Sequence, residues 1–198
     1  MATVLVSHAS VQSPGLKAFN LANPCLARAL FAGVKDVENR QRSSPPGWYA
    51  VYLNKNSANT SSFGLPPNFT DLMQAKGVAP WSEAEIRSRL GCIVGVVRLG
   101  PPKTTPSPWR MPEIGKFAFS VEEAIELLTP LPVMPMMGLW QLPDAVTKAL
   151  TAAILEQAVK QALGEKYLYS LMHTKSIAYI YSASGYMEGL LSLSVSHP

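Results

Sequence analysis

The spacing of apolar and polar residues predicts short helices mixed with short extended segments. Helical periodicity or capping residues indicate helices at residues 24–31, 69–75, 83–91, 124–128 and 144–163. Alternating or continuous apolar runs indicate extended segments at residues 17–21, 36–40, 48–53, 92–99, 117–119, 131–134 and 138–140. Because the two kinds of element are interspersed without a regular strand–helix alternation, the chain is expected to belong to the α+β class.

Capping residues define several of the predicted helices. Asn23 precedes a proline and can accept hydrogen bonds from the first amides of a helix. Gly33 suits the left-handed position that ends such a helix. Ser82 stands three residues before a glutamate, which is the spacing of a capping box, and Ser120 repeats that spacing. Ser120 is therefore the reason for expecting a helix at residues 124–128.

The most apolar segment, residues 92–99, is interrupted only by Gly95 and predicts a central strand buried on both faces. The following residues, 100–112, contain five prolines and are expected to form an irregular surface loop. Residues 48–53 combine aromatic and β-branched side chains and predict a second buried strand.

Composition places these elements in a single domain. The chain has 198 residues, of which 47% are hydrophobic and 15% charged. We expect a flexible tail at residues 1–16, one domain at 17–148, and a helix followed by a poorly specified tail at 149–198. No apolar run reaches the ~18 residues of a membrane span and no secretory signal is apparent. The predicted location is intracellular, cytoplasmic or nuclear, without membrane association.

Histidine and cysteine positions argue against several kinds of catalytic site. His8, His173 and His197 all lie near the ends of the chain. Cys25 and Cys92 are too far apart in sequence for a metal or redox motif and are expected to be buried thiols. We therefore expect neither a metal nor a cofactor.

Charge is distributed unevenly along the chain. Residues 17–110 contain 12 Lys and Arg against 5 Asp and Glu, whereas residues 111–198 contain 5 against 8. A basic half is typical of proteins that bind a polyanion such as nucleic acid, although the same charge also serves solubility.

A compact charged motif lies in the basic half, where Lys35 follows the predicted helix end and Glu38 and Arg40 share one face of an extended segment. Arg40 offers a fork of donors suited to phosphate, and Glu38 offers an acceptor for a base edge or an orienting partner for either cation. The alternative is a purely structural ion pair between Glu38 and Arg40, with Lys35 neutralising the helix end.

The sequence GVKDVENR at residues 33–40 resembles the G-x-K-x-x-E-x-R motif of ASCH domains in the PUA-like superfamily. The resemblance extends over residues 17–148, through the capped helix, the glycine turn and strand at 47–53, the strand at 91–99 and the Gly-Leu-Trp at 138–140. It implies a small PUA-like mixed β-barrel flanked by helices, with a C-terminal helical extension. It also implies a cleft beside the motif for RNA or a nucleotide.

Ligand-binding residues in this hypothesis are Lys35, Glu38, Arg40, Arg42 and Trp48. Arg42 extends the basic track, although solvated surface charge is the ordinary explanation for it. Trp48, like Tyr49 and Tyr52, could stack on a base, but aromatic residues on strands are more often part of a core.

Two alternative functions remain open. Some small bacterial relatives of this superfamily are amidohydrolases acting on N4-acetylcytidine, and Lys35 and Glu38 would then be the catalytic residues. However, Glu38 occupies the place where those enzymes have a threonine, so their mechanism does not transfer directly. The third candidate is a protein-interaction module resembling a transcription coregulator, in which the apolar stripe of the helix at 144–163 docks a partner.

Overall fold

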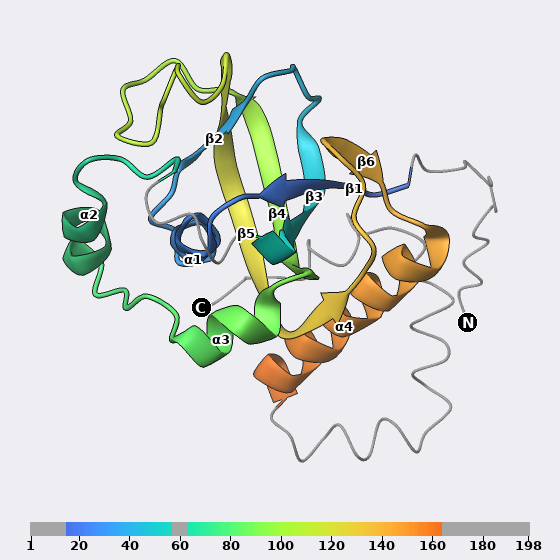
Figure 1. Cartoon of the computed structure of the whole chain (residues 1–198). Helices are drawn as coiled ribbons and strands as arrows, with labels where there is room; N and C mark the ends of the chain where they lie inside the picture. The colour runs from blue at the N-terminus through green and yellow to red at the C-terminus, as the bar shows by residue number, and fades with distance from the viewer. Residues whose placement is uncertain (1–14, 57–62, 164–198) are drawn as a thin grey trace, which may run out of the picture.

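The computed structural model describes residues 15–56 and 63–163. Its helices are α1 (Pro24–Phe31), α2 (Phe69–Ala75), α3 (Glu83–Arg89) and α4 (Asp144–Leu163). Its strands are β1 (Lys17–Leu21), β2 (Val37–Arg40), β3 (Gly47–Leu53), β4 (Cys92–Pro102), β5 (Phe117–Pro132) and β6 (Leu139–Gln141). The strands form one sheet in the order β2-β5-β4-β3-β1-β6, which curls strongly into a half-barrel (Figure 1). The α+β prediction is confirmed.

The sheet is mixed, with a parallel β1–β3 pair and antiparallel pairing elsewhere. The predicted central strand is confirmed in β4, which pairs with β3 on one side and β5 on the other. Gly95 of β4 has a clear physical role, because a Cβ atom there would lie 2.2 Å from the carbonyl oxygen of Ile125. Glycine therefore allows the backbones to approach.

The prediction of a helix at residues 124–128 is wrong, because these residues form the middle of β5. Strand β5 also includes the strand expected at 117–119 and the first two residues of the strand expected at 131–134. Its side chains Phe119 and Leu127 are buried, and the strand supplies the second neighbour that the apolar strand β4 requires. Pairing along β4 thus overrides the local helix signal given by Ser120.

The loop expected at residues 100–112 also differs from the prediction. Strand β4 continues to Pro102, and Trp109 is 1% exposed rather than part of a surface loop. The Trp109 ring packs edge-on against Phe69 of α2, with 6.1 Å between ring centroids. This loop is therefore anchored in the core.

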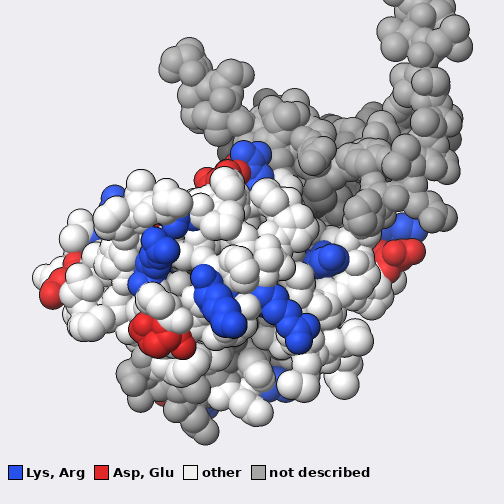
Figure 2. Space-filling model, turned by 90° about the horizontal axis from the view of Figure 1, so that it is seen from above, with Lys and Arg blue, Asp and Glu red and all other residues white. Residues whose placement is uncertain are grey.

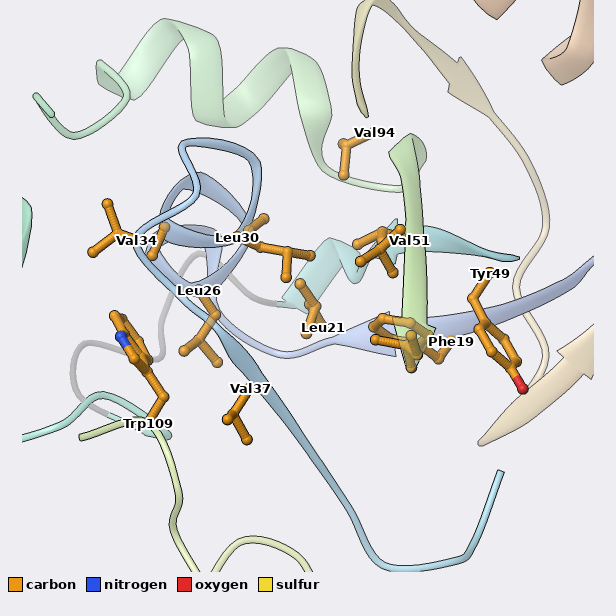
Figure 3. Packing of buried hydrophobic residues seen from close by; sticks show 14 of the residues in the cluster. Phe19, Leu21, Leu26, Leu30, Val34, Val37, Tyr49, Val51, Val94 and Trp109 are labelled. Atoms are coloured by element: carbon orange, nitrogen blue, oxygen red, sulfur yellow. The ribbon is translucent and has the colours of Figure 1, made fainter. Parts of the chain in front are cut away.

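The two faces of the sheet build two clusters of buried side chains. On the concave face, α1 contributes Leu26 and Leu30, which pack with Val37 and Val51 (Figure 3). On the other face, Ala50 and Tyr52 of β3 pack with residues of α4. This division follows from strand alternation, which sends successive β3 side chains to opposite faces.

Local capping predictions for α1 and α3 are confirmed. The Asn23 side chain accepts a hydrogen bond from the backbone N–H of Cys25 at 2.8 Å. Gly33 has φ +67°, in the left-handed region. Ser82 and Glu85 form the complete capping box of α3.

Helix α4 lies across the outside of the sheet (Figure 1), and its stripe residues Leu150 and Ile154 are buried there. No helix in the described ranges is long and apolar enough to cross a membrane. The poorly specified tail predicted after α4 lies outside the described residues.

Candidate functional site

Lys35 is positioned by the turn that ends α1. The backbone N–H groups of Val34 and Lys35 both donate to the carbonyl of Ala29 at 2.9 Å, which reverses the chain after Gly33. The Lys35 side chain then folds toward β2 and donates to the carbonyl oxygen of Val37. Lys35 is consequently 3% exposed, so it does not sit as a free charge at the helix end.

Glu38 is the centre of the charged motif. One carboxylate oxygen lies 2.5 Å from Nζ of Lys35, and the other lies 3.7 Å from the guanidinium of Arg40. Glu38 is only 4% exposed. The three predicted motif residues are therefore brought together, but two of them are buried.

Arg40 is the member of the motif that reaches the surface, with 19% of its side chain exposed. Its guanidinium stacks on the ring of Phe19, 4.7 Å from the centroid. Within the described residues its other close charged contact is the 3.7 Å pair with Glu38, which is too long for a hydrogen bond. Arg40 is thus held in place while its donor fork stays available.

Tyr49 of β3 completes the surroundings of Arg40. Its hydroxyl donates to the carbonyl of Pro45 at 2.5 Å, and its ring packs against Phe19 with centroids 6.3 Å apart. Burial raises the pKa of Tyr49, and the nearby charge of Arg40 opposes that rise. Sequence reasoning considered Tyr49 for base stacking but gave no sign of Phe19, because β1 and β2 are not neighbours in the sheet and their side chains meet only when the sheet curls.

The other face of β2 fastens the loop between β4 and β5. The Asn39 side chain donates to the carbonyl of Trp109 at 2.7 Å and accepts from the N–H of Met111 at 3.2 Å. Gln41 donates to the carbonyl of Ile114 at 2.8 Å. Because Asn39 and Arg40 are adjacent on one strand, the loop and the motif are held in a fixed relation.

Asp36 provides another attachment for the same loop. Its carboxylate accepts from Lys103 at 2.5 Å and from the Ser107 hydroxyl at 2.6 Å. Burial by itself would raise the pKa of Asp36, but the hydrogen bonds from Lys103 and Ser107 outweigh it and hold the pKa below its usual value.

Basic residues gather around this end of the molecule. Residues 35–46 and 103–116 together contain six Lys and Arg against three Asp and Glu. Arg42 in the β2–β3 turn is exposed, as are Arg110 and Lys116 in the loop after β4. Figure 2 views this end from above and shows several Lys and Arg side chains close together on it. Arg42 was among the predicted site residues, whereas the two loop cations, Arg110 and Lys116, were not.

Trp48 does not join the motif. It lies on the face of the sheet opposite Tyr49, half-buried with Ala50 and Tyr52 beneath α4, and it pairs across the sheet with Arg98. This difference could have been predicted from the sequence, because consecutive residues of a strand, such as Trp48 and Tyr49, point to opposite faces of the sheet. Tyr49, and not Trp48, is the β3 aromatic beside Arg40.

Two cavities in the described part of the chain lie away from the motif. One of about 480 Å³ is lined by Arg89, Gln157 and β5 residues 124–128. A second, of about 30 Å³, lies between α1, α2 and α3 and includes Trp81. Within residues 15–56 and 63–163, no group of three His, Cys, Asp or Glu side chains is placed to hold a metal ion.

Comparison of the chain with protein-family models gave no match, and comparison with curated proteins gave none either.

Proposed function

We propose that this chain binds single-stranded RNA or a nucleotide at the basic end around Arg40, without covalent chemistry. The observation that carries the proposal is the held but incompletely paired guanidinium of Arg40, stacked on Phe19 and 3.7 Å from Glu38. Such a guanidinium offers two parallel donors to a phosphate and loses little conformational entropy on binding.

The loop cations support the same proposal. Arg110 and Lys116 are exposed on a segment that Asn39 and Asp36 fasten to β2, the strand that carries Arg40. Positive charges on a fixed frame attract a phosphate backbone and release its counterions on binding. The motif in this proposal is of the ASCH type and the half-barrel is of the PUA-like type, as the sequence resemblance implies.

The hydrolytic alternative has less support. A nucleophilic or basic Lys35 requires access to the substrate, whereas this side chain is 3% exposed and its Nζ is hydrogen-bonded to Glu38 and to the Val37 carbonyl. The protein-interaction alternative also has less support, because Leu150 and Ile154 of the apolar stripe of α4 pack on the sheet instead of facing a partner.

The test uses fluorescence anisotropy with a labelled single-stranded RNA of mixed sequence at several salt concentrations. Arg40→Gln is expected to weaken binding about tenfold, and Arg110→Gln to reduce the slope of log affinity against log salt by about 0.7. Arg98→Gln is the matched control, because Arg98 is half-exposed and paired with Glu122 and Glu123.

The control separates a local site from net charge, since all three variants lose one positive charge. Equal weakening by Arg98→Gln and Arg40→Gln would mean that the RNA responds only to overall charge. Affinity that does not change with salt, or absence of binding at low salt, would overturn the proposal. Release of acetate from N4-acetylcytidine that stops in Lys35→Met, under conditions where this variant is folded, would replace it with the hydrolytic function.

A further inference from the structure

A second candidate site lies at the open edge of β5, far along the strand from Arg40. Strand β2 pairs only with residues 117–120 of β5, whereas β4 runs along its other side. Among the described residues, β5 residues 123–126 therefore pair with a strand on one side only, and residues 127–130 lie in the register irregularity between Gly95 and Ile93. An unpaired strand edge presents a row of backbone donors and acceptors.

Gln157 of α4 shows where these backbone groups point. Its side chain donates to the carbonyl of Glu126 at 2.8 Å and accepts from the N–H of Leu128 at 2.9 Å. One side-chain amide thus takes the place that a peptide group of a neighbouring strand would occupy. Because backbone direction alternates along a strand, the N–H and C=O of Ala124 face the same open side.

The cavity of about 480 Å³ runs along this edge. It is lined by five consecutive β5 residues, 124–128, together with Arg89 of α3 and Gln157 of α4. Lining by consecutive residues is what a space beside a strand produces. Leu128 adds an apolar side chain that is 66% exposed.

Two guanidinium groups share one carboxylate at this cavity. Arg89 lies 3.0 Å from one oxygen of Glu126, and Arg28 lies 3.6 Å from the other. A second carboxylate, that of Glu85, interacts electrostatically with both guanidinium groups and is also hydrogen-bonded to Ser82 in the capping box. Nε of Arg89 is buried and has no hydrogen-bond partner in the described structure. The Arg28 guanidinium donates through Nε to the carbonyl of Ala79 and lies 3.6 Å from Glu126, too far for a hydrogen bond, so its terminal nitrogens can still donate to a further carboxylate.

The geometry points to this edge as a site for an extended peptide segment with an acidic side chain. The peptide adds a short strand beside residues 122–125, next to the position that Gln157 occupies. Its backbone pairs with Ala124, and its carboxylate lies against Arg89 and Arg28. This site is separate from the RNA site, so either proposal can fail without the other.

The probes are the labelled hexapeptide TVEVTV and its uncharged counterpart TVQVTV, added to the full chain. Binding is measured by fluorescence anisotropy and by shifts of backbone amide signals in NMR spectra. TVEVTV is expected to shift the amides of residues 124–128 and to bind about tenfold more tightly than TVQVTV, as one charge-assisted hydrogen bond implies.

Ala124→Pro is the most specific variant, because it removes an outward N–H while leaving the ladder to β4 intact. We expect Ala124→Pro to weaken the binding of TVEVTV about tenfold, and we expect the same of Arg89→Met. Arg87→Met is the matched control, because Arg87 lies on the same helix with 74% of its side chain exposed.

Three results would overturn the inference. The first is the absence of shifts at residues 124–128 with TVEVTV at about 1 mM, the weak end of specific affinity. The second is an affinity of Ala124→Pro for TVEVTV that equals the affinity of the unaltered protein. The third is a dimer of the unliganded chain that Ala124→Pro converts to a monomer, which would assign the edge to a second copy of this chain. If Arg89→Met does not fold, TVQVTV still tests the charge requirement on the unaltered protein.

Discussion

Nζ of Lys35 lies 2.5 Å from a carboxylate oxygen of Glu38, and both side chains are almost completely buried. The pair joins the end of α1 to β2, two elements that are covalently linked by only a short turn. Removal of two charges from water is costly, and the pair stays favourable only while both partners are present.

Glu38→Gln and Lys35→Met are each expected to lower the free energy of unfolding by about 3–5 kcal/mol, because each leaves a buried charge without its main partner. The double variant Lys35→Met with Glu38→Gln is expected to recover part of that loss. Chemical denaturation measures all three.

The exposed pair of Arg87 and Glu83 provides the comparison, since both side chains are more than 70% exposed. Arg87→Met is expected to change stability by less than about 1 kcal/mol. If the single variants of Lys35 and Glu38 changed the free energy of unfolding as little as Arg87→Met, the buried pair would not be important for stability.

Asn39→Ala is expected to destabilise the protein by about 1–3 kcal/mol, because the Trp109 carbonyl and the Met111 N–H both lose their partner. The variant also releases the loop from β2, so RNA affinity is expected to fall although no cation is removed. Denaturation and the anisotropy assay measure the two effects. Gln41→Ala, which removes one exposed hydrogen bond, is the milder control.

Gly115→Ala is expected to destabilise the fold by about 1–3 kcal/mol through crowding. A Cβ atom at position 115 would lie 2.5 Å from the backbone nitrogen of Arg40, so β2 or the loop must move. Thermal unfolding measures the loss, and Lys116→Ala serves as the exposed neighbouring control. An unchanged midpoint in Gly115→Ala would show that the close approach is readily relieved.

The stability contributed by Asp36 is expected to depend on pH. Because its pKa in the folded protein lies below the ordinary value near 3.9, folding favours the charged form. This contribution is complete above about pH 4 and decreases as the pH falls through the folded-state pKa. The stability difference between the native protein and Asp36→Asn should therefore shrink in acid. A difference that grows on acidification would contradict this assignment.

The sequence was most informative where the structural cause is local. Asn23 and Ser82 cap helices through hydrogen bonds to residues two or three positions away, and their neighbours in sequence are sufficient to identify them. Strand β4 can also be recognised from its sequence, because a strand that is buried on both faces has a continuous apolar run instead of alternating apolar and polar residues. The class of the fold follows from these elements.

Local signals failed where pairing decides the outcome. Ser120 and Glu123 have capping-box spacing, but they lie in β5 because β4 offers a long apolar edge. The motif was foreseeable from strand alternation at Glu38 and Arg40. Its burial, and the support from Phe19, depend on β1 and β2 being brought together, which spacing along one segment does not encode.

Strand β5 also connects surfaces that the two proposals treat separately. It begins at Phe117, the register partner of Arg40, and includes Leu128, whose backbone N–H donates to Gln157. Its pairing with β4 contains irregularities near Leu99 and between Ile93 and Gly95. One continuous strand therefore carries residues of both proposed surfaces, and each surface has its own register irregularity beside it.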